Sequence, residues 1–335
     1  MRYNNIDFNN KTILITGAAG FIGSNLAFYF QENYPGAIVV AFDCFRSGET
    51  FSNGNLKSFA HFKNLLGFNG VVISGDINDK DALDSLEKNY KFDYIFHQAA
   101  ISDTTVLEQD VMMKTNVNAY EELLKIAIKH GANMIYASSA ATYGDSDRFE
   151  VGYEQPNNAY GFSKVMMDNI TYKYLKQGVD ISIVGLKYFN VYGPREFYKN
   201  KTASMVVQFG HQILNGLTPK LFEGSDKILR DFIYIDDIIQ ANIKACDPKK
   251  SGVYNVGTGW ARSFEDIVDI LQKELKIDNK KEYIPNPFIG SYQFFTQANI
   301  DSTKENLGYE PRYSMEDGIK AYVPEIKRLF EHEVK

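Results

Sequence analysis

A tyrosine and a lysine lie four residues apart in the segment YGFSK, as Tyr160 and Lys164. Residues with this spacing share one face of a helix, so the phenol and the amine can approach each other. A free tyrosine, with a pKa of about 10, is a poor base near neutral pH, but a nearby ammonium group favours the phenolate and lowers that pKa. Tyr160 can then take the proton of a substrate hydroxyl while a hydride leaves the same carbon. The chain has 22 tyrosines, so the spacing needs support from other residues.

Two further polar residues supply that support. Ser139 directly follows the apolar segment Ala132–Ser138, which we predict as a strand. A hydroxyl at the carboxyl end of such a strand points into the crevice where open parallel sheets bind ligands, and it can hydrogen-bond a reacting oxygen there. Asn116 lies in a helix-like segment although asparagine is a mediocre helix former, which predicts a buried hydrogen-bonding role. We expect both residues to lie near the tyrosine–lysine pair.

A glycine-rich turn lies between a predicted strand, Thr12–Thr16, and a predicted amphipathic helix, Phe21 to about Asn33. Its glycines are Gly17, Gly20 and Gly23. The first permits a tight exit from the strand, the second lets the backbone approach a pyrophosphate, and the third lets the helix pack close to the strand. The N–H groups at the start of the helix then face the phosphates. This strand–turn–helix context predicts a dinucleotide-binding unit.

An acid ends the next predicted strand, twenty residues beyond Gly23, as Asp43. An acid at this place accepts hydrogen bonds from the adenosine ribose hydroxyls, which favours NAD. Arg46 follows closely and can pair with a 2′-phosphate, which favours NADP, so these two residues leave the cofactor open. Asp76, after the third predicted strand, is either an adenine contact or a helix N-cap before Asn78.

Short apolar strands alternate with helices through the first half of the chain. This order implies right-handed crossovers and an α/β fold, a Rossmann-type doubly wound parallel sheet covered on both faces. The predicted strands are Thr12–Thr16, Ile38–Phe42, Val71–Ser74, Tyr94–His97, Ala132–Ser138 and Ile181–Tyr188.

The second half is less regular and predicts a smaller C-terminal α/β lobe that closes over the carboxyl ends of the strands. We place the boundary near Asn190, so that residues 1–189 form the dinucleotide-binding domain and residues 190–335 mainly the substrate-binding lobe. Asp231–Ala245 looks like a strand and a helix, so we expect the chain to return to the first domain at about 228–248. The expected helices of the lobe are Ala203–Asn215, Phe264–Leu275 and Met315–Leu329, and the expected loops are Asn190–Glu196, Leu221–Asp226, Val256–Ser263 and Tyr283–Gln297.

Composition narrows the class of protein. The net charge of −6 lacks the basic footprint of a nucleic-acid-binding protein. Cys44 and Cys246 lie far apart with no C-x-x-C spacing, so we expect reduced thiols in a cytoplasmic protein, with no disulfide framework and no metal site. Residues 1–10 are polar and lack the features of a signal peptide, and no apolar stretch approaches the roughly 18–20 residues of a membrane span. We expect a soluble protein.

The glycine turn, Asn116, Ser139, Tyr160 and Lys164 together resemble the extended short-chain dehydrogenase/reductase superfamily of sugar-nucleotide enzymes, over almost the whole chain. Within it, several stretches resemble the ADP-L-glycero-D-manno-heptose 6-epimerase family, which interconverts two ADP-heptoses for the lipopolysaccharide inner core. These stretches are YASSAATYG at 136–144, YFNVYGPRE at 188–196, PKLFEGS at 219–225, RD at 230–231 and TQA at 296–298.

The resemblance implies a redox epimerisation without net oxidation. Hydride leaves C6 of the heptose for a bound cofactor, a ketone forms, and hydride returns to the opposite face. A single base does not readily serve both stereoisomers, and the family is thought to use a tyrosine and a lysine. Tyr160 matches the first and Lys199 the second, beside Ser139 and Lys164. By residue type alone, Lys199 reads as a solvated loop residue.

The resemblance also implies binding roles. The expected cofactor is NADP, with NAD as the alternative, and the expected partners are an ADP-heptose substrate and further copies of the chain, as a pentamer. The residues expected at the cofactor are Gly17, Gly20, Phe21, Ile22, Gly23, Asp43, Cys44, Arg46, Asp76, Ile77, Gln98, Ala99, Ala100, Ile101, Ser102, Asn116, Lys164, Val191 and Lys199. Those expected at the substrate are Asn190, Lys201, Gln208, Phe222, Glu223, Gly224, Ser225, Arg230 and Tyr292, with an aromatic ring for the adenine and an arginine for phosphate.

Four features depart from the family's commoner pattern. Gln98 replaces a carboxylate, Lys201 a serine and Gln208 a histidine, and the segment Phe45–Asn69 is longer than usual. We therefore cannot place the lysines that would bind a 2′-phosphate. These departures concern cofactor preference and substrate contacts, whereas the catalytic set is complete.

Three rival functions share part of this residue pattern. A sugar-nucleotide 4,6-dehydratase needs an acid near the active serine, where this chain has Ala140 and Ala141. A UDP-hexose 4-epimerase is a closer rival, but it would not need Lys199. A catalytically silent dinucleotide-binding protein should have lost Tyr160, Lys164 or the serine. The sequence therefore favours the heptose epimerase.

Overall fold

The central sheet has β1 (Thr12–Thr16) in its middle and carries seven parallel strands in the order β10-β6-β5-β4-β1-β2-β3. The computed structural model describes residues 1–278, 280–285 and 294–334. This sheet confirms the predicted Rossmann-type α/β fold. The other strands are β2 (Ile38–Asp43), β3 (Val71–Ser74), β4 (Tyr94–His97), β5 (Asn133–Ser139), β6 (Ile183–Tyr188) and β10 (Gly252–Val256).

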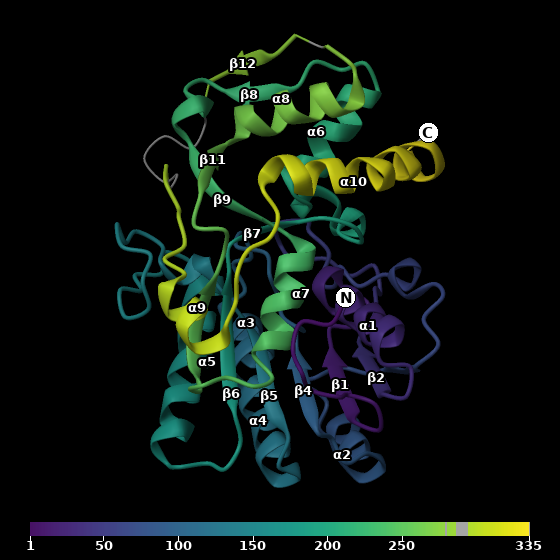
Figure 1. The fold of residues 1–335 in the computed structure, drawn as a ribbon, viewed down its shortest axis with the longest axis vertical. Coiled ribbons are helices and arrows are strands. Elements are labelled where there is room, and N and C mark those ends of the chain that lie inside the picture. Colours follow the sequence, from purple (N-terminus) through teal and green to yellow (C-terminus); the bar gives the residue numbers. More distant parts are fainter. Residues whose placement is uncertain (279, 286–293, 335) are drawn as a thin grey trace.

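Helices cover both faces of this sheet (Figure 1). One face packs against α1 (Phe21–Asn33) and α7 (Ile235–Lys244), and the other against α2 (Lys80–Asn89), α4 (Ala119–His130) and α5 (Ala159–Lys176). Parallel strands that are covered on both faces read as continuous apolar runs, which is why their segments were visible in the sequence. Shorter helical pieces complete the domain, namely α3 (Gln109–Met112), a π-helix (Met113–Asn118) and α9 (Asp301–Leu307).

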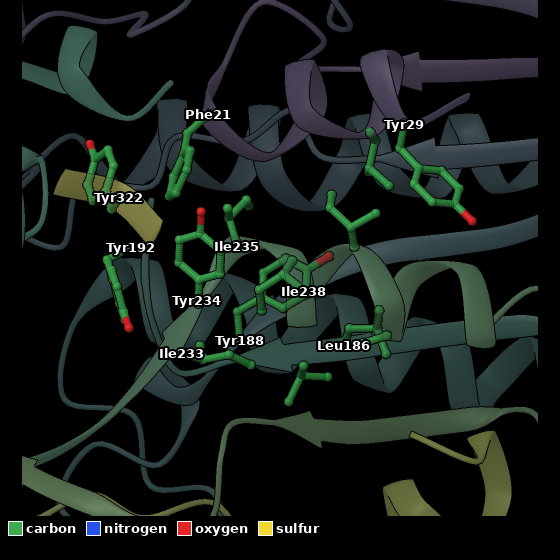
Figure 2. Packing of buried hydrophobic residues seen from close by; sticks show 14 of the residues in the cluster. Phe21, Tyr29, Leu186, Tyr188, Tyr192, Ile233, Tyr234, Ile235, Ile238 and Tyr322 are labelled. Atoms are coloured by element: carbon green, nitrogen blue, oxygen red, sulfur yellow. The ribbon is translucent and has the colours of Figure 1, made fainter. Parts of the chain in front are cut away.

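The two faces of the sheet bury different sets of side chains, because successive residues of a strand point to opposite faces. Ile13 and Ile15 of β1 belong to the cluster beneath α1 and α7, whereas Leu14 belongs to the cluster beneath α2, α4 and α5. Figure 2 shows the first cluster, with Ile235 and Ile238 of α7 among side chains of α1 and β6. This packing fixes α1, and with it the glycine turn.

A second lobe lies beyond the carboxyl ends of the strands, at the top of Figure 1. β7 pairs in parallel with β9, and β9 pairs antiparallel with β11. β8 and β12 form a separate parallel pair, and α6, α8 and α10 pack together beside it. The elements are β7 (Asn190–Tyr192), α6 (Met205–Leu214), β8 (Lys220–Phe222), β9 (Leu229–Tyr234), β11 (Ala261–Ser263), α8 (Phe264–Leu275), β12 (Glu282–Ile284) and α10 (Met315–Leu329).

The sequence expectations for this half need two corrections. Each of the four expected loops contains part or all of a three-residue strand, β7, β8, β11 or β12, and such strands are too short to give a periodic signal. The segment 228–248 returns to the first domain only in part. Its helix α7 packs on α1, but its strand β9 joins the small sheet, and the strand that enters the central sheet is β10. Apolar pattern alone does not say which sheet a strand joins. The boundary near Asn190 stays a proposal.

Among the described residues, no helix combines the length and the apolar character that a membrane crossing requires.

Candidate active site

A cleft of about 640 Å³ lies at the carboxyl ends of the central strands, where open α/β sheets bind ligands. All four predicted catalytic residues line it: Ser139, Tyr160, Lys164 and Lys199. They come from the end of β5, from the first turns of α5, and from the second lobe. The fold thus brings together residues that are up to sixty positions apart in the sequence.

Ser139 connects β5 to the reacting position. Its hydroxyl oxygen accepts a hydrogen bond from the Ala141 amide at 3.1 Å, which holds the side chain at the strand end. The Ser139 side chain also hydrogen-bonds to Tyr160. Burial raises the pKa of the Tyr160 phenol, and the bond to Ser139 acts in the opposite direction because it stabilises the phenolate. The bond to Ser139 therefore favours the phenolate form of Tyr160.

Lys164 lies one helical turn after Tyr160 on α5, whose first turn is capped by the Asn158 side chain accepting from the Gly161 amide at 2.8 Å. The Lys164 Nζ donates to the Ala137 carbonyl at 2.6 Å and lies 5.8 Å from the centre of the Tyr160 ring. Burial lowers the pKa of Lys164 to about 8, and nearby Asp168 opposes that shift. An amine with this pKa is still largely protonated at neutral pH and favours the phenolate.

Asn116 has the buried hydrogen-bonding role that its position predicted. It is fully buried in the π-helix, its Oδ1 accepts from the Ile101 amide at 2.8 Å, and its Nδ2 donates to the Ile101 carbonyl at 3.0 Å. The same Nδ2 donates to the Ser163 hydroxyl at 2.9 Å. Asn116 thereby ties the segment after β4 to the helix that carries Tyr160, and it acts through these neighbours since it does not line the cleft itself.

Lys199 enters the cleft from a 3₁₀ turn, Phe197–Thr202. Its Nζ lies 5.8 Å from the centre of the Phe21 ring, at the start of α1. Burial lowers the pKa of Lys199, and the carboxylate of Glu196 opposes that shift. Glu196 is fully buried and accepts hydrogen bonds from the Ser204 amide and hydroxyl. The Lys199 side chain is thus partly buried in the cleft, and it is not the solvated loop residue that its type alone suggests.

The glycine turn has no room for side chains at two of its three glycines. A Cβ on Gly17 (φ +69°) would lie 2.6 Å from the Ala99 amide nitrogen, and one on Gly23 would lie 2.2 Å from the Gly17 carbonyl oxygen. The helix α1 begins without a side-chain cap, so the N–H groups of its first turn face the cleft beside Phe21 and Ile22. This is the arrangement that binds a pyrophosphate, and the turn fits a dinucleotide.

Replacing Gly23 by alanine is expected to lower the free energy of unfolding by about 1–3 kcal/mol, because the added methyl overpacks a backbone contact. The variant should also purify with little bound dinucleotide, since α1 must move away from the turn. Urea unfolding and the cofactor content of the purified protein measure these two effects. Gly252→Ala is the matched control, because its added Cβ would meet nothing closer than 3.5 Å. Full cofactor content in Gly23→Ala would contradict the role of the turn.

Asp43, Cys44, Asp76 and Ile77, which were expected at the cofactor, all line the cleft. The buried Asp43 carboxylate accepts from the Ala19 amide at 2.9 Å and the Phe45 amide at 3.1 Å, and burial raises its pKa. Each carboxylate oxygen keeps lone pairs for a ribose hydroxyl.

The loop after β3 shows why Asp76 was open to two interpretations. The Asp76 carboxylate accepts from the Asn78 amide at 2.8 Å, so it closes the turn and lines the cleft at once. The N-cap of α2 is Asp79, whose side chain accepts from the Asp81 amide. Asp76 therefore has a local structural role without being the helix cap.

Arg46 is placed differently from its sequence expectation. Its guanidinium donates to the backbone carbonyls of Phe59 and Tyr198, and it is not among the residues that line the described cleft. Lys57 and Ser58 do line the cleft, and the Ser58 side chain hydrogen-bonds to Cys44, the residue after Asp43. The sequence analysis missed both residues. They lie in an irregular segment whose path no pattern predicts.

The wall after β4 runs from Gln98 to Ser102 and lines the cleft. The Gln98 amide bridges two buried groups, since its Oε1 accepts from the Tyr188 hydroxyl at 3.1 Å and its Nε2 donates to Asn242 Oδ1 at 3.3 Å. A carboxylate can only accept and could not replace both bonds. A glutamine in place of the family's carboxylate at position 98 is thus explained by its bond to Asn242 in α7.

The substrate residues divide into three groups. Asn190 and Arg230 line the cleft. So do Val191, which was expected at the cofactor, and Thr296, which the sequence analysis gave only within the TQA stretch and without a role. Lys201, Gln208 and the stretch Phe222–Ser225 do not line the cleft as described. Tyr292 lies outside the described residues.

Two of these substrate positions have local structural contacts. Gln208 Nε2 donates to the Ala203 carbonyl at 2.6 Å and closes the turn that carries Lys199. Arg230 is 8% exposed at the lobe side of the cleft. The hydroxyls of Ser225 and Thr296 are buried, and neither has a hydrogen-bond partner among the described residues. Buried hydroxyls without partners are costly. Thr296 lines the cleft, so its hydroxyl is available to a bound ligand, whereas Ser225 does not line the cleft as described.

The chain matches known proteins over most of its length. Residues 13–257 match the model of the NAD dependent epimerase/dehydratase family. A Helicobacter pylori ADP-L-glycero-D-manno-heptose-6-epimerase structure is 52% identical with a TM-score of 0.89, covering 98% of this chain and 99% of that one. A Thermotoga maritima UDP-glucose 4-epimerase structure, with UDP-glucose, is 28% identical with a TM-score of 0.82, covering 95% and 99%. A Bacillus cereus UDP-glucuronic acid 4-epimerase structure, with NAD, is 28% identical with a TM-score of 0.78, covering 95% and 99%. The chain belongs to the NAD dependent epimerase/dehydratase family.

Proposed function

We propose that the protein is an ADP-L-glycero-D-manno-heptose 6-epimerase that supplies a precursor of the lipopolysaccharide inner core. The observation that carries this proposal is the presence of two partly buried candidate bases in one cleft, Tyr160 from α5 and Lys199 from the second lobe. Two bases on different elements suit an enzyme that must protonate and deprotonate both configurations at one carbon. The 52% identity to the H. pylori epimerase supports the same substrate.

The chain's residues divide the work at C6. A nicotinamide dinucleotide, when bound, supplies the hydride acceptor and donor. Tyr160, aided by Ser139 and the Lys164 ammonium, takes the hydroxyl proton of one epimer. Lys199 acts on the other epimer as a neutral amine, which its burial favours. In one turnover the first base keeps the proton that it took from the starting hydroxyl, and the other base, in its protonated form, gives a proton to the oxygen when the ketone is reduced from the opposite face. Proton exchange with solvent then restores both bases.

The ADP moiety is proposed to lie on the lobe side of the cleft. Arg230 provides a guanidinium for phosphate, and the partnerless hydroxyl of Thr296, which also lines the cleft, provides a donor. Ser225, whose buried hydroxyl also lacks a partner, is a proposed contact outside the described lining. Phe222 and Tyr292 are proposed to bracket the adenine, as the sequence suggested. Lys201 and Gln208 stay proposed substrate contacts. Neither lines the described cleft, so this proposal requires the ligand to extend to the turn Phe197–Thr202.

For the cofactor we propose NADP. Asp43 can accept from the ribose 3′-hydroxyl, while Lys57 and Ser58, which line the cleft on the same side, meet the 2′-phosphate. Lys57 Nζ lies 2.9 Å from a Glu49 carboxylate oxygen, so the lysine is held near the cleft by an exposed partner that phosphate can displace. NAD has no 2′-phosphate, so Lys57 would have no such contact with it.

Mass spectrometry of the dinucleotide released by denaturation is expected to identify NADP. Lys57→Ala should weaken NADP binding about 10- to 100-fold, the value of one hydrogen bond to a charged group, and leave NAD binding unchanged. Titration of the cofactor-free variant with each dinucleotide measures this. Lys129→Ala, at the exposed end of α4, is the control. Release of NAD alone, or equal effects on both dinucleotides, would overturn the assignment.

A UDP-hexose 4-epimerase is the rival function. It is not favoured, because the T. maritima UDP-glucose 4-epimerase shares 28% identity with this chain against 52% for the heptose epimerase. Parallel assays with ADP-D-glycero-D-manno-heptose and UDP-glucose separate the two functions. Turnover of UDP-glucose alone would support the rival.

The cellular compartment and the oligomeric state are also proposals. Cys44 and Cys246 are both free thiols, which suits the reducing cytoplasm. The proposed homo-oligomer, a pentamer, rests on the family resemblance alone. Light scattering of the purified protein measures the mass of the assembly and so the number of chains.

A further inference from the structure

The connector between β2 and β3, residues 45–69, is docked on the glycine turn. The His61 amide and the Asn64 Nδ2 both donate to the Ala19 carbonyl, at 3.0 and 3.1 Å. On its other side, Asn55 Nδ2 donates to the Asp103 carboxylate at 2.7 Å. The connector therefore spans the adenosine end of the cleft and is fixed at both margins.

The same connector holds Tyr198, the residue directly before Lys199. The Arg46 guanidinium donates to the Tyr198 carbonyl. The His61 ring stacks on the Tyr198 ring with 4.0 Å between centroids and 4° between planes. The Tyr198 hydroxyl bonds to Glu333. Three independent contacts thus fix the backbone and side chain next to the proposed second base.

The turn that carries Lys199 needs this support. Arg195 and Asn200, on either side of the lysine, have φ values of +75° and +54°, which non-glycine residues rarely adopt. Such strained positions persist only where surrounding contacts determine them. One of those contacts also comes from the connector, since Arg195 Nη1 donates to the Asn64 carbonyl at 2.6 Å.

We propose that Arg46 and His61 are positioning residues for Lys199. The connector then fixes the position of this second base from the cofactor side of the cleft. This inference rests on the proposed function, in which Lys199 serves one of the two epimers. It reassigns Arg46 from the 2′-phosphate to the Lys199 turn, because its guanidinium already donates to two carbonyls outside the cleft lining. Neither residue touches the reacting atoms.

The expected signature is selective for one epimer. Displacing a catalytic group by about 1 Å can cost on the order of 100-fold in rate, so Arg46→Met should slow oxidation of the Lys199-dependent epimer about 10- to 100-fold. Oxidation of the Tyr160-dependent epimer should stay within about twofold of the parent rate, because α5 does not contact Arg46. Single-turnover formation of reduced nicotinamide from each pure epimer measures both rates.

His61 offers a rescue test. His61→Ala removes the stacked ring and should show the same epimer-selective loss, whereas His61→Phe keeps a ring over Tyr198 and should recover most of the rate. Arg148→Met is the matched control, because Arg148 lies on the surface over Tyr153 and beside Glu150. Hydrogen exchange of the peptide 197–202 should be faster in Arg46→Met and His61→Ala than in the parent or Arg148→Met.

The closing experiment compares Lys199→Met, Arg46→Met, His61→Ala and Arg148→Met on both epimers, with bound cofactor and melting temperature measured for each. The proposal expects Arg46→Met and His61→Ala to share the epimer preference of Lys199→Met at full cofactor content. Equal loss on both epimers, loss of cofactor, or no loss would overturn it. If Lys199→Met itself shows no epimer preference, the two-base function fails instead, so the two failures are distinguishable.

Discussion

Replacing Tyr160 by phenylalanine is expected to lower the epimerisation rate by about 10²- to 10⁴-fold, the usual contribution of a general acid–base group. The ring is kept, so the packing of α5 against the residues around Phe51 and Ile101 is unchanged. Only the hydroxyl and its bond to Ser139 are lost. Lys164 cannot replace it, because its Nζ is directed to the Ala137 carbonyl.

The measurement for this variant is the steady-state rate with each pure epimer, with bound cofactor and melting temperature as checks. Tyr172→Phe is the matched control, because Tyr172 lies on the same helix and does not line the cleft. The rate should also fall as the pH rises through the pKa of Lys164, about 8, since the ammonium that favours the phenolate is then lost. A Tyr160→Phe enzyme within tenfold of the parent would contradict its assignment as a base.

Replacing Lys199 by methionine is expected to cost a similar factor, about 10²- to 10⁴-fold in epimerisation. Methionine keeps the length and fills the partly buried site, while the amine is removed. Burial lowers the pKa of Lys199, which increases the neutral fraction that can act as a base. The Lys199-dependent oxidation should therefore rise with pH through that lowered pKa, and this limb should vanish in the variant.

Three measurements separate a lost base from a damaged fold. The variant should retain its dinucleotide, keep its melting temperature, and still oxidise the epimer served by Tyr160. Lys320→Met, on the exposed face of α10, is the control. If epimerisation by Lys199→Met stays near the parent rate, Lys199 is a structural lysine and the two-base account is wrong.

The regular part of this fold was predictable because its signals are local. β1 and α1 begin and end where the apolar run, the glycines and the amphipathic pattern predicted. Ser139, Tyr160 and Lys164 meet because a strand end and one helix face determine their places. The three-residue strands and β10 were not predicted from the sequence, because their pairing depends on contacts with distant segments.

The loops carried the residues that the sequence could not place. Arg46 has the chemistry for a 2′-phosphate, yet tertiary contacts turn its guanidinium toward the Phe59 and Tyr198 carbonyls. Lys57 and Ser58 reach the cleft through a connector without periodicity. Lys199 is unremarkable in type and spacing, and only the family resemblance indicated it. Its burial and its surroundings became visible in the structure.

The central claim is that this chain inverts C6 of an ADP-heptose. The most direct test incubates the purified holoprotein with pure ADP-D-glycero-D-manno-heptose and follows the ratio of the C6 epimers by NMR. The account predicts that the L-glycero epimer appears and that the ratio settles at a constant value, with no added oxidant or reductant. An unchanged ratio in the presence of bound cofactor would contradict it.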